Sequence, residues 1–341
     1  MSPGRSNDRV TIKDVAREAG VSVTTVSHAL NNPEGSRVSE ETRTHVKSVA
    51  TALGYRANPS ARALRTRRTD TIALVGRQLA TTEHLGRMVR GAQDAVRAHG
   101  GLLIVADTAD DEDGVIDALI DHQVDGIILG ALYHQEVTVP SALAGVPTVV
   151  VNAFTSDTRY SWVVPDEVAG GRAGAEVLLA SGHRRVAMIN NRDDIPAAHG
   201  RAEGFVARCR ESGVEPVVAA CGPSGRAAYD VALRLLDAPP AERPTGMFCF
   251  ADSMAMGVYA AAAQAGVHVP QELSVVGFDD MVLINESLSP PLTSIALPHA
   301  EMAAWAVERL YELLDTPDAA AQNLRIVGRV VERGSVMRPS S

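Results

Sequence analysis

From residue 71 onward the sequence alternates short apolar runs with amphipathic stretches, and this alternation constrains the fold more than any other feature. Strands are predicted at 71–76, 101–107, 124–130, 146–152, 184–190, 215–220, 245–252 and 273–280. Helices are predicted at 84–98, 112–121, 166–180, 198–212, 226–237 and 253–265. Strands that alternate with helices form parallel sheets with helices on both faces. Because the series restarts once, the pattern predicts an α/β fold with two doubly wound parallel-sheet lobes, which bind ligands at the carboxyl ends of their strands.

The chain lacks the short motifs that mark common enzymes and metal sites. No G-x-G-x-x-G follows a predicted strand, and no G-K-[ST] or G-x-S-x-G occurs, so neither a nucleotide cofactor nor a hydrolase nucleophile is indicated. The three cysteines form no C-x-x-C, and no H-x-x-x-H is present. We therefore expect no cofactor, no metal and no enzyme activity.

Charge divides the chain into a basic head and an acidic body. Residues 1–69 contain 12 Lys and Arg against 6 Asp and Glu, whereas the remainder contains 20 against 35. A basic segment on a chain of net charge −9 indicates that the head alone has a polyanionic partner. No apolar run reaches the roughly 18 residues of a membrane helix, and the first residues carry no apolar signal region. A cytoplasmic chain without a membrane partner is therefore expected.

The stretch TIKDVAREAGVSVTTVSHALNN, residues 11–32, predicts two short helices joined by a Gly-Val-Ser corner. Thr11 and Ser22 are suitable N-caps for the two helices, and Gly20 is suited to end the first. A third helix starts at Ser39 and is expected to bury Val46, Val49, Ala50 and Leu53. Two helices about a short corner, with a third closing the core, form a helix-turn-helix module.

The second helix is the one that would read DNA. If Val26 and Leu30 face the core, the opposite face carries Val23, Thr24, Ser27, His28 and Asn31. Val23 can pack on a thymine methyl group, Thr24 can bond either base type, and His28 can donate to guanine. The alternative is a solvated helix face in a plain three-helix bundle.

A basic stretch, YRANPSARALRTRRTD, follows the third helix. Asn58 and Pro59 can begin a short helix in which Ala61 and Leu64 share one face among arginines. A helix this short needs a partner helix and DNA to hold it. Its small apolar face suits a pair of helices in a minor groove, with Leu64 as a wedge between base steps. The alternative is a basic, flexible linker.

These motifs together resemble the lactose-repressor/galactose-repressor (LacI/GalR) family. In that family the second helix reads the major groove, and the N-P-x-A-x-x-L hinge helix pairs across a dimer in the minor groove. The resemblance implies major-groove roles for Val23, Thr24, Ser27 and His28, backbone roles for Thr11, Ser22, Asn31, Arg37 and Ser39, and minor-groove roles for Ala61 and Leu64. The family commonly has Arg where His28 stands, so the base read there stays open.

Further stretches, including HQVDGIILG, ASGHRRVAMI, GRAEGF, FADSMAMG, ELSVVGFDD and PPLTSI, resemble the periplasmic-binding-protein-like effector domain of the same family. The resemblance thus covers about residues 10–337 and implies three crossings between lobes. The expected divisions are a disordered segment at 1–9, the helix-turn-helix domain at 10–57, a hinge helix and linker at 58–69, and the effector domain at 70–341. Within the effector domain, the N-lobe is expected at 70–161 and 292–321, and the C-lobe at 163–290 and 322–341.

The resemblance also implies that Arg201 and Asp279 grip effector hydroxyls. A fork of donors beside a fixed acceptor suits adjacent hydroxyls, although the two could instead pair as a structural ion pair. Further lining candidates follow predicted strands and are Asn152, Arg77, Thr81 and Glu83. Aromatic residues are only 4% of the chain, so partners that could stack on a sugar are few. A sugar, a nucleoside, a polyol, an anionic metabolite or no effector at all stay open.

The expected function is that of a sequence-specific transcriptional regulator, a repressor that binds a palindromic double-stranded operator as a homodimer under the control of a small-molecule effector. The C-terminal stretch VVERGSVMRPSS has no leucine heptads, which favours a dimer over a coiled-coil tetramer. The alternative is a periplasmic-type solute-binding protein without a DNA role. The reader helix and the absent signal region disfavour it.

Overall fold

The computed structural model describes residues 10–31, 38–55, 68–77, 85–131 and 133–339. The chain divides into two compact units, residues 1–69 and 70–341. The segment predicted to be disordered, 1–9, and residues 58–67 of the predicted hinge lie outside the described residues. Within the described part of the chain, no helix is both long enough and apolar enough to cross a membrane.

The first unit contains the three predicted helices, α1 (Ile12–Glu18), α2 (Val23–Asn31) and α3 (Glu40–Ala52). Its core takes buried side chains from all three helices: Val15, Ala16, Ala19, Val26, Ala29, Val46 and Ala50. The other predicted core residues, Leu30, Val49 and Leu53, are half-buried at its margin. Gly20 follows α1 with φ 65°, a left-handed conformation that glycine adopts without a Cβ penalty.

The first lobe of the second unit is built on a fully parallel six-stranded sheet in the order β11-β5-β4-β3-β1-β2. Its strands are β1 (Thr71–Gly76), β2 (Leu102–Asp107), β3 (Gly126–Gly130), β4 (Thr148–Val151), β5 (Ser161–Pro165) and β11 (Asn323–Ile326). Its helices are α5 (Leu85–Ala98), α6 (Glu112–Asp121), α12 (His299–Asp315) and the 3-10 turn η2 (Ser141–Leu143).

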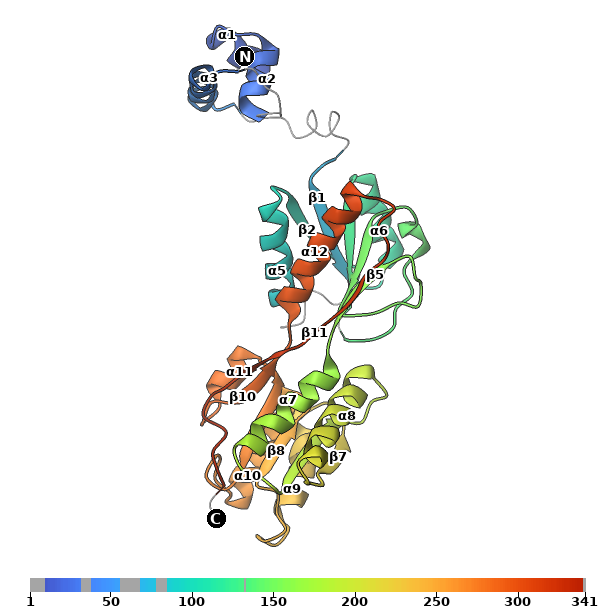
Figure 1. The fold of residues 1–341 in the computed structure, drawn as a ribbon, viewed down its shortest axis with the longest axis vertical. Coiled ribbons are helices and arrows are strands. Elements are labelled where there is room, and N and C mark those ends of the chain that lie inside the picture. Colours follow the sequence, from blue (N-terminus) through green and yellow to red (C-terminus); the bar gives the residue numbers. More distant parts are fainter. Residues whose placement is uncertain (1–9, 32–37, 56–67, 78–84, 132, 340–341) are drawn as a thin grey trace, which may run out of the picture. The chain divides into compact units, whose positions relative to one another are not determined.

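The inner strands β1, β3 and β4 of this lobe are buried on both faces, as is typical of a parallel sheet, whereas the edge strands β2 and β11 are partly exposed. Ile72 and Leu74 of β1 pack in one cluster with residues of α5 and α12. Ala73 and Val75, which point to the opposite face, pack with α6 and η2. Figure 1 shows these helices beside the sheet strands.

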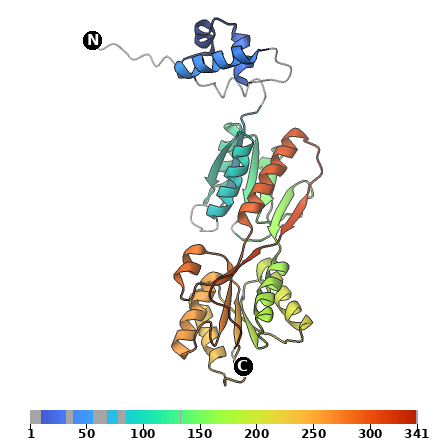
Figure 2. The same ribbon diagram turned by 60° about the vertical axis from the view of Figure 1, so that its left-hand side comes forward.

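The second lobe repeats the plan with the strand order β12-β10-β9-β8-β6-β7, in which only β12 is antiparallel to its neighbour. Its strands are β6 (Val186–Asn191), β7 (Val217–Cys221), β8 (Gly246–Cys249), β9 (Ser274–Asp279), β10 (Thr293–Ala296) and β12 (Arg329–Val331). Its helices are α7 (Glu167–Ala180), α8 (Pro196–Glu211), α9 (Gly225–Leu236), α10 (Asp252–Ala265) and α11 (Val282–Ser287). One face packs against α7 and α8 and the other against α9 and α10 (Figure 2).

The three crossings between the lobes lie later in the chain than predicted. Residues 161–165 form β5 of the first sheet, so this lobe continues past 161. Residues 293–296 pair with β9 in the second lobe, and residues 323–326 pair with β5 in the first. The predicted boundaries near 162, 291 and 321 are therefore corrected to about 166, 297 and 327. The physical reason is that the chain completes each strand before it crosses.

The carboxyl ends of strands from both sheets meet at the junction between the lobes. Arg87 of α5, the helix that follows β1, reaches Asp280 after β9 at 3.1 Å. His134, which follows β3, lies 3.5 Å from Glu167 at the start of α7. The side chains that follow strand ends are thus gathered where doubly wound folds bind ligands.

Candidate DNA-binding and effector sites

Helix α2 presents the predicted reading face at its N-terminal end. Val23 keeps 42% of its surface exposed, and Thr24 is exposed as well. Ser27 and His28, one turn further on, are half-buried, whereas Val26 is fully buried. The inward position predicted for Val26 and the outward positions predicted for Val23 and Thr24 are therefore confirmed, whereas Ser27 and His28 lie at the margin between the two faces.

Hydroxyl side chains fix the starts of the head helices. Ser22 accepts a hydrogen bond from the backbone N–H of Thr25 at 3.0 Å, and Ser39 accepts one from Thr42 at 3.2 Å. The carboxylate of Asp14 accepts the backbone N–H and the hydroxyl of Thr11, at 3.0 and 2.7 Å. These three predicted phosphate contacts are exposed at helix N-termini, where unpaired backbone N–H groups favour anions.

Arg43 of α3 is a structural residue of the head that the sequence pattern did not indicate. Its side chain is buried, donates to the carbonyl of Ala29 in the last turn of α2 at 3.4 Å, and pairs with Glu40 at 3.1 Å. The last carbonyls of a helix have no partner within it, so Arg43 supplies one from a neighbouring helix. It thereby helps to fix α2 against α3.

Arg37, Ala61, Leu64, Thr81 and Glu83 lie outside the described residues, as does the side chain of Asn31.

Arg201 is in contact with several of the residues that the second lobe places at the junction. It comes from α8 and is 4% exposed. Its Nε donates to Glu167 at 2.8 Å, and its Nη1 donates to the carbonyl of Phe250 at 2.6 Å. The guanidinium lies over the rings of Phe278 and Phe250, at 3.5 and 4.4 Å from their centroids. Aromatic faces attract a cation, so this position is strongly determined.

Asp279, the predicted partner of Arg201, is held more loosely. Its carboxylate lies 3.8 Å from Arg201 Nη1, a full ångström further than the contact between Arg201 and Glu167. It ends β9 in an uncommon backbone conformation, with φ 104°. Burial raises the pKa of Asp279 to about 7; Arg201 and Arg87 oppose this shift, and the charge of Glu167 adds to it. The ionised form of such a buried carboxyl group is stabilised by any hydrogen-bond donor that a ligand supplies.

Glu167 is a residue of this cluster that the sequence pattern did not indicate. It is the first residue of α7, is 3% exposed, and lies between Arg201 and His134. Burial alone would raise its pKa, but Arg201 and His134 outweigh that effect and hold the pKa below its usual value. An acidic residue in the first turn of a helix is common for electrostatic reasons, so nothing in the sequence distinguished Glu167.

A second set of buried carboxylates holds the segment after β9. Asp252 accepts hydrogen bonds from Ser294, from the backbone of Met281 and from Asn285, at 2.7, 2.7 and 3.0 Å. Burial, followed by the charge of Asp279, raises the pKa of Asp252 to about 7. Asp280 pairs with Arg333 at 2.7 Å as well as with Arg87. These contacts fix the segment that directly follows Asp279.

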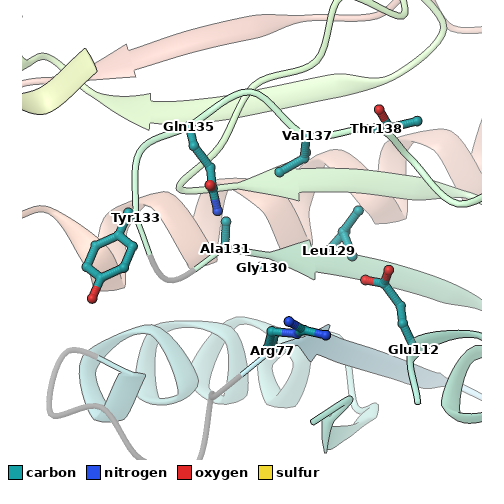
Figure 3. Close-up of a pocket in the computed structure, with 9 residues that line it drawn as sticks. All are labelled: Arg77, Glu112, Leu129, Gly130, Ala131, Tyr133, Gln135, Val137 and Thr138. Carbon is teal, nitrogen blue, oxygen red and sulfur yellow. The ribbon is translucent and has the colours of Figure 1, made fainter. Parts of the chain in front are cut away.

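The first lobe contributes a pocket of about 470 Å³ at the carboxyl ends of β1 and β3 (Figure 3). Its lining residues are Arg77, Glu112, Leu129, Gly130, Ala131, Tyr133, Gln135, Val137 and Thr138. Of the predicted residues, Arg77 lines this pocket and also lies 3.6 Å from Asp110. Tyr133 and Gln135 come directly after a predicted strand, so their strand-end position was a signal that could have identified them.

Asn152 has a structural contact in the same region. It is 4% exposed, follows β4 with φ 59°, and donates through Nδ2 to the carbonyl of Ala131 at 3.0 Å. This bond ties the end of β4 to the loop that lines the pocket. The structure therefore brings Arg201 close to Asp279, and places Arg77 and Asn152 beside a pocket of the first lobe.

Comparison with known proteins covers nearly the whole chain. Residues 11–58 match the family model of bacterial regulatory proteins of the lacI family, and residues 175–336 match a periplasmic binding protein-like domain. The HTH-type transcriptional repressor CytR of Escherichia coli K12 is 30% identical over 98% of both chains. The ribose operon repressor of the same organism is 30% identical over 95% of this chain and 99% of its own.

Solved structures agree with these matches. A complex of the transcriptional regulator CelR with cellobiose superposes with a TM-score of 0.65, at 28% identity, over 96% of this chain and 100% of the other.

Proposed function

The chain belongs to the lacI family of bacterial regulatory proteins, and from this premise we propose how it acts: as a homodimeric repressor of a palindromic operator, controlled by a small molecule bound in its second unit. The observation that carries the proposal is the exposed start of α2, with Val23 and Thr24 available on a capped, well-packed helix. Family membership makes transcriptional repression through DNA binding the function of this chain.

The proposed operator contacts are of three kinds: contacts to base edges, to backbone phosphates and to the minor groove. Val23, Thr24, Ser27 and His28 would meet base edges in the major groove, since the N-terminal part of a recognition helix lies deepest there. Thr11, Ser22, Asn31, Arg37 and Ser39 would hold backbone phosphates. Ala61 and Leu64 would enter the minor groove at the centre of the site. Two-fold symmetry of a homodimer would match the symmetry of the operator, and such a repressor works in the bacterial cytoplasm, where its operator lies.

Selection of bound sequences from random duplex DNA tests the DNA part of the proposal. We expect the wild type to enrich a palindrome, and the double variant Val23→Ala, Thr24→Ala to lose preference at the corresponding bases in each half-site. Each lost base contact should cost about 1–3 kcal/mol. Gln264→Ala, which changes an exposed residue of α10, is the matched control. Enrichment of no sequence by the wild type would refute the proposal.

The effector part rests on the residues at the junction. Asp279 is a buried acceptor beside Arg201, and the pocket of the first lobe combines Tyr133 with Gln135 and Arg77. An aromatic ring beside a few polar groups is typical of sites for sugars and related metabolites. The named relatives point the same way, because one represses a ribose operon and another was solved with cellobiose.

A thermal-shift screen of neutral sugars, nucleosides and their acidic derivatives tests this part. A ligand that binds only the folded state raises the unfolding temperature in proportion to its occupancy. We expect at least one compound to stabilise the protein and to change its operator affinity. No shift with any compound would leave DNA binding intact but remove the case for an effector of this class.

A further inference from the structure

Two buried carboxylates stand beside the single guanidinium of Arg201, and they do not share it equally. Glu167 accepts from Nε at 2.8 Å, whereas Asp279 lies 3.8 Å from Nη1. Nη1 is already engaged by the carbonyl of Phe250 at 2.6 Å. Among the described residues, Nη2 of Arg201 forms no hydrogen bond. Nη2 is therefore the nitrogen of this guanidinium that can still donate to a ligand.

The charge balance around Arg201 is therefore acidic. Glu167 from α7, Asp279 from β9 and Asp252 from α10 are all at most 8% exposed. Arg87 and Arg333 are the other arginines close by, but both are paired with Asp280. A buried cation that already has a close carboxylate partner gains little from a second anion, and that anion must also be stripped of water beside like charges.

We propose that Glu167 is a positioning residue that sets effector specificity: by taking the Nε side of Arg201 it leaves Asp279 as a free acceptor, so that the site admits neutral ligands rich in hydroxyl or amide donors and rejects carboxylate and phosphate ligands. This inference rests on the proposed effector site and decides between ligand classes that the sequence left open. Nδ1 of His134, from the first lobe, lies 3.5 Å from the other oxygen of Glu167 and forms no hydrogen bond with any described residue.

The test compares matched neutral and anionic probes on the full-length protein. The pairs are ribose and its phosphate, glucose and glucuronate, and the common nucleosides and their monophosphates, each titrated by calorimetry. Glu167→Gln keeps the shape and one acceptor for Arg201 but removes the charge. Glu176→Gln is the matched control, because Glu176 also joins α7 to an arginine of α8, Arg208, but at the surface, with the Glu176 side chain 52% exposed.

We expect the wild type to bind the neutral member of a pair more tightly than the anionic one. In Glu167→Gln the ratio of the two affinities should shrink by about tenfold or more, because one unpaired charge partner in a buried site is worth at least that factor. Glu176→Gln should keep the wild-type ratio. A merely structural role for Glu167 would weaken both probes alike and leave the ratio unchanged. An unchanged ratio, or a wild type that prefers the anion, overturns the proposal.

A second measurement needs no ligand and keeps the proposal separate from the effector screen. The groups that face Asp279 are Arg201, Glu167, Asp252 and Arg87. Removing the charge of Glu167 should let Asp279 pair with Arg201 and lower the pKa of Asp279. The free energy of unfolding is therefore measured against pH for wild type, Glu167→Gln, Asp279→Asn and the double variant.

The sign of the expected effect follows from linkage. A carboxyl group whose pKa is raised in the folded state stabilises the protein below its unfolded pKa, and this stability is lost as the pH rises toward the folded value. The part of this loss that depends on Asp279 should be smaller in the Glu167→Gln background. An equal loss in both backgrounds overturns the inference even if no probe binds. If Glu167→Gln does not fold, Asp279→Asn serves instead, since removing the other carboxylate should relax the affinity ratio in the same direction.

Discussion

His183 shows how one buried side chain can hold a distant segment of this protein. Its Nδ1 lies 2.9 Å from the hydroxyl of Thr245, and its Nε2 lies 2.9 Å from that of Ser274 and 3.0 Å from the carbonyl of Met337. One imidazole thus joins the end of α7, the second sheet and the C-terminal segment. Burial lowers its pKa, and the hydrogen bond to Met337 only partly opposes this, so at pH 7 the folded protein holds this ring in its neutral form.

Replacing His183 with Ala should lower the free energy of unfolding by about 2–4 kcal/mol, because the change leaves buried polar partners unsatisfied and opens a cavity. The wild type should also lose stability as the pH falls below the ordinary histidine value of 6.5, since only the unfolded state then takes up the proton. Urea unfolding across this range measures both effects. His199→Ala is the control, because His199 is an exposed residue of α8, and it should show neither effect.

The effector residues show where single-residue prediction succeeds and where it stops. Arg201 and Asp279 could be proposed because the stretches GRAEGF and ELSVVGFDD resemble the family's motifs. Their true pairing could not, since Glu167 competes for Arg201 from 34 positions away in the sequence. Whether Glu167 or Asp279 pairs with Arg201 depends on the distances between these side chains. The packing of α7 against α8 sets these distances, and the sequence alone does not show them.

At the scale of elements, one contact joins a helix of the first lobe to the second lobe. Arg87 of α5 donates to both the carbonyl and the carboxylate of Asp280. We expect Arg87→Gln to lower the free energy of unfolding by only about 1 kcal/mol, because the Arg87 side chain is one-third exposed and solvent screens the pair. Hydrogen exchange should nevertheless become faster in α11 and at the start of α5.

Arg90→Gln is the matched control for this experiment. Arg90 lies one turn nearer the C-terminus of the same helix and pairs with Asp94 at 3.4 Å within α5, with 78% of its side chain exposed. Its replacement should leave exchange at the junction unchanged. If the two variants behave alike, Arg87 does not link the lobes.

The regular elements of the body were largely predictable, but four short strands and one long helix were not predicted. Each predicted strand and helix of the body is present within a few residues of its predicted bounds. The sequence pattern was not used to predict the strands β5, β10, β11 and β12, the short helices η2 and α11, or α12, a helix of 17 residues. Short strands have few positions in which to show a pattern, and the sheet of a strand such as β11 is chosen by pairing with a distant partner, as Asn323 pairs with Trp162. The helix α12 has no such reason, because its buried residues Met302, Ala306 and Leu310 recur at helical spacing.

At the scale of the whole molecule, the two units divide the work of a regulator between them. The basic head, with 12 Lys and Arg in residues 1–69, supplies the sequence-independent attraction to phosphates. The acidic body adds no such attraction and is free to bind a small molecule. Effector and operator affinities must then change each other by the same factor, since their coupling free energy is reciprocal.

A substitution of the proposed wedge residue, Leu64, separates the sequence-specific part of the DNA affinity from the sequence-independent attraction to phosphates. Leu64 lies outside the described residues, and its role follows from the hinge motif alone. Replacing Leu64 with Ala removes apolar surface but no charge. The number of counterions that the DNA releases on binding should therefore not change. We expect operator affinity to fall by about 1–3 kcal/mol, while the slope of log affinity against log salt and the binding to nonspecific duplex stay the same.

Fluorescence anisotropy at several salt concentrations, with operator and scrambled duplexes, measures all three quantities. Val217→Ala is the control, because Val217 is an exposed valine on the edge strand β7 of the body and its loss should change none of them. If Leu64→Ala lowers operator and scrambled binding equally, the hinge acts as a basic linker. If it changes neither, Leu64 does not enter the groove, and specificity lies with α2 alone.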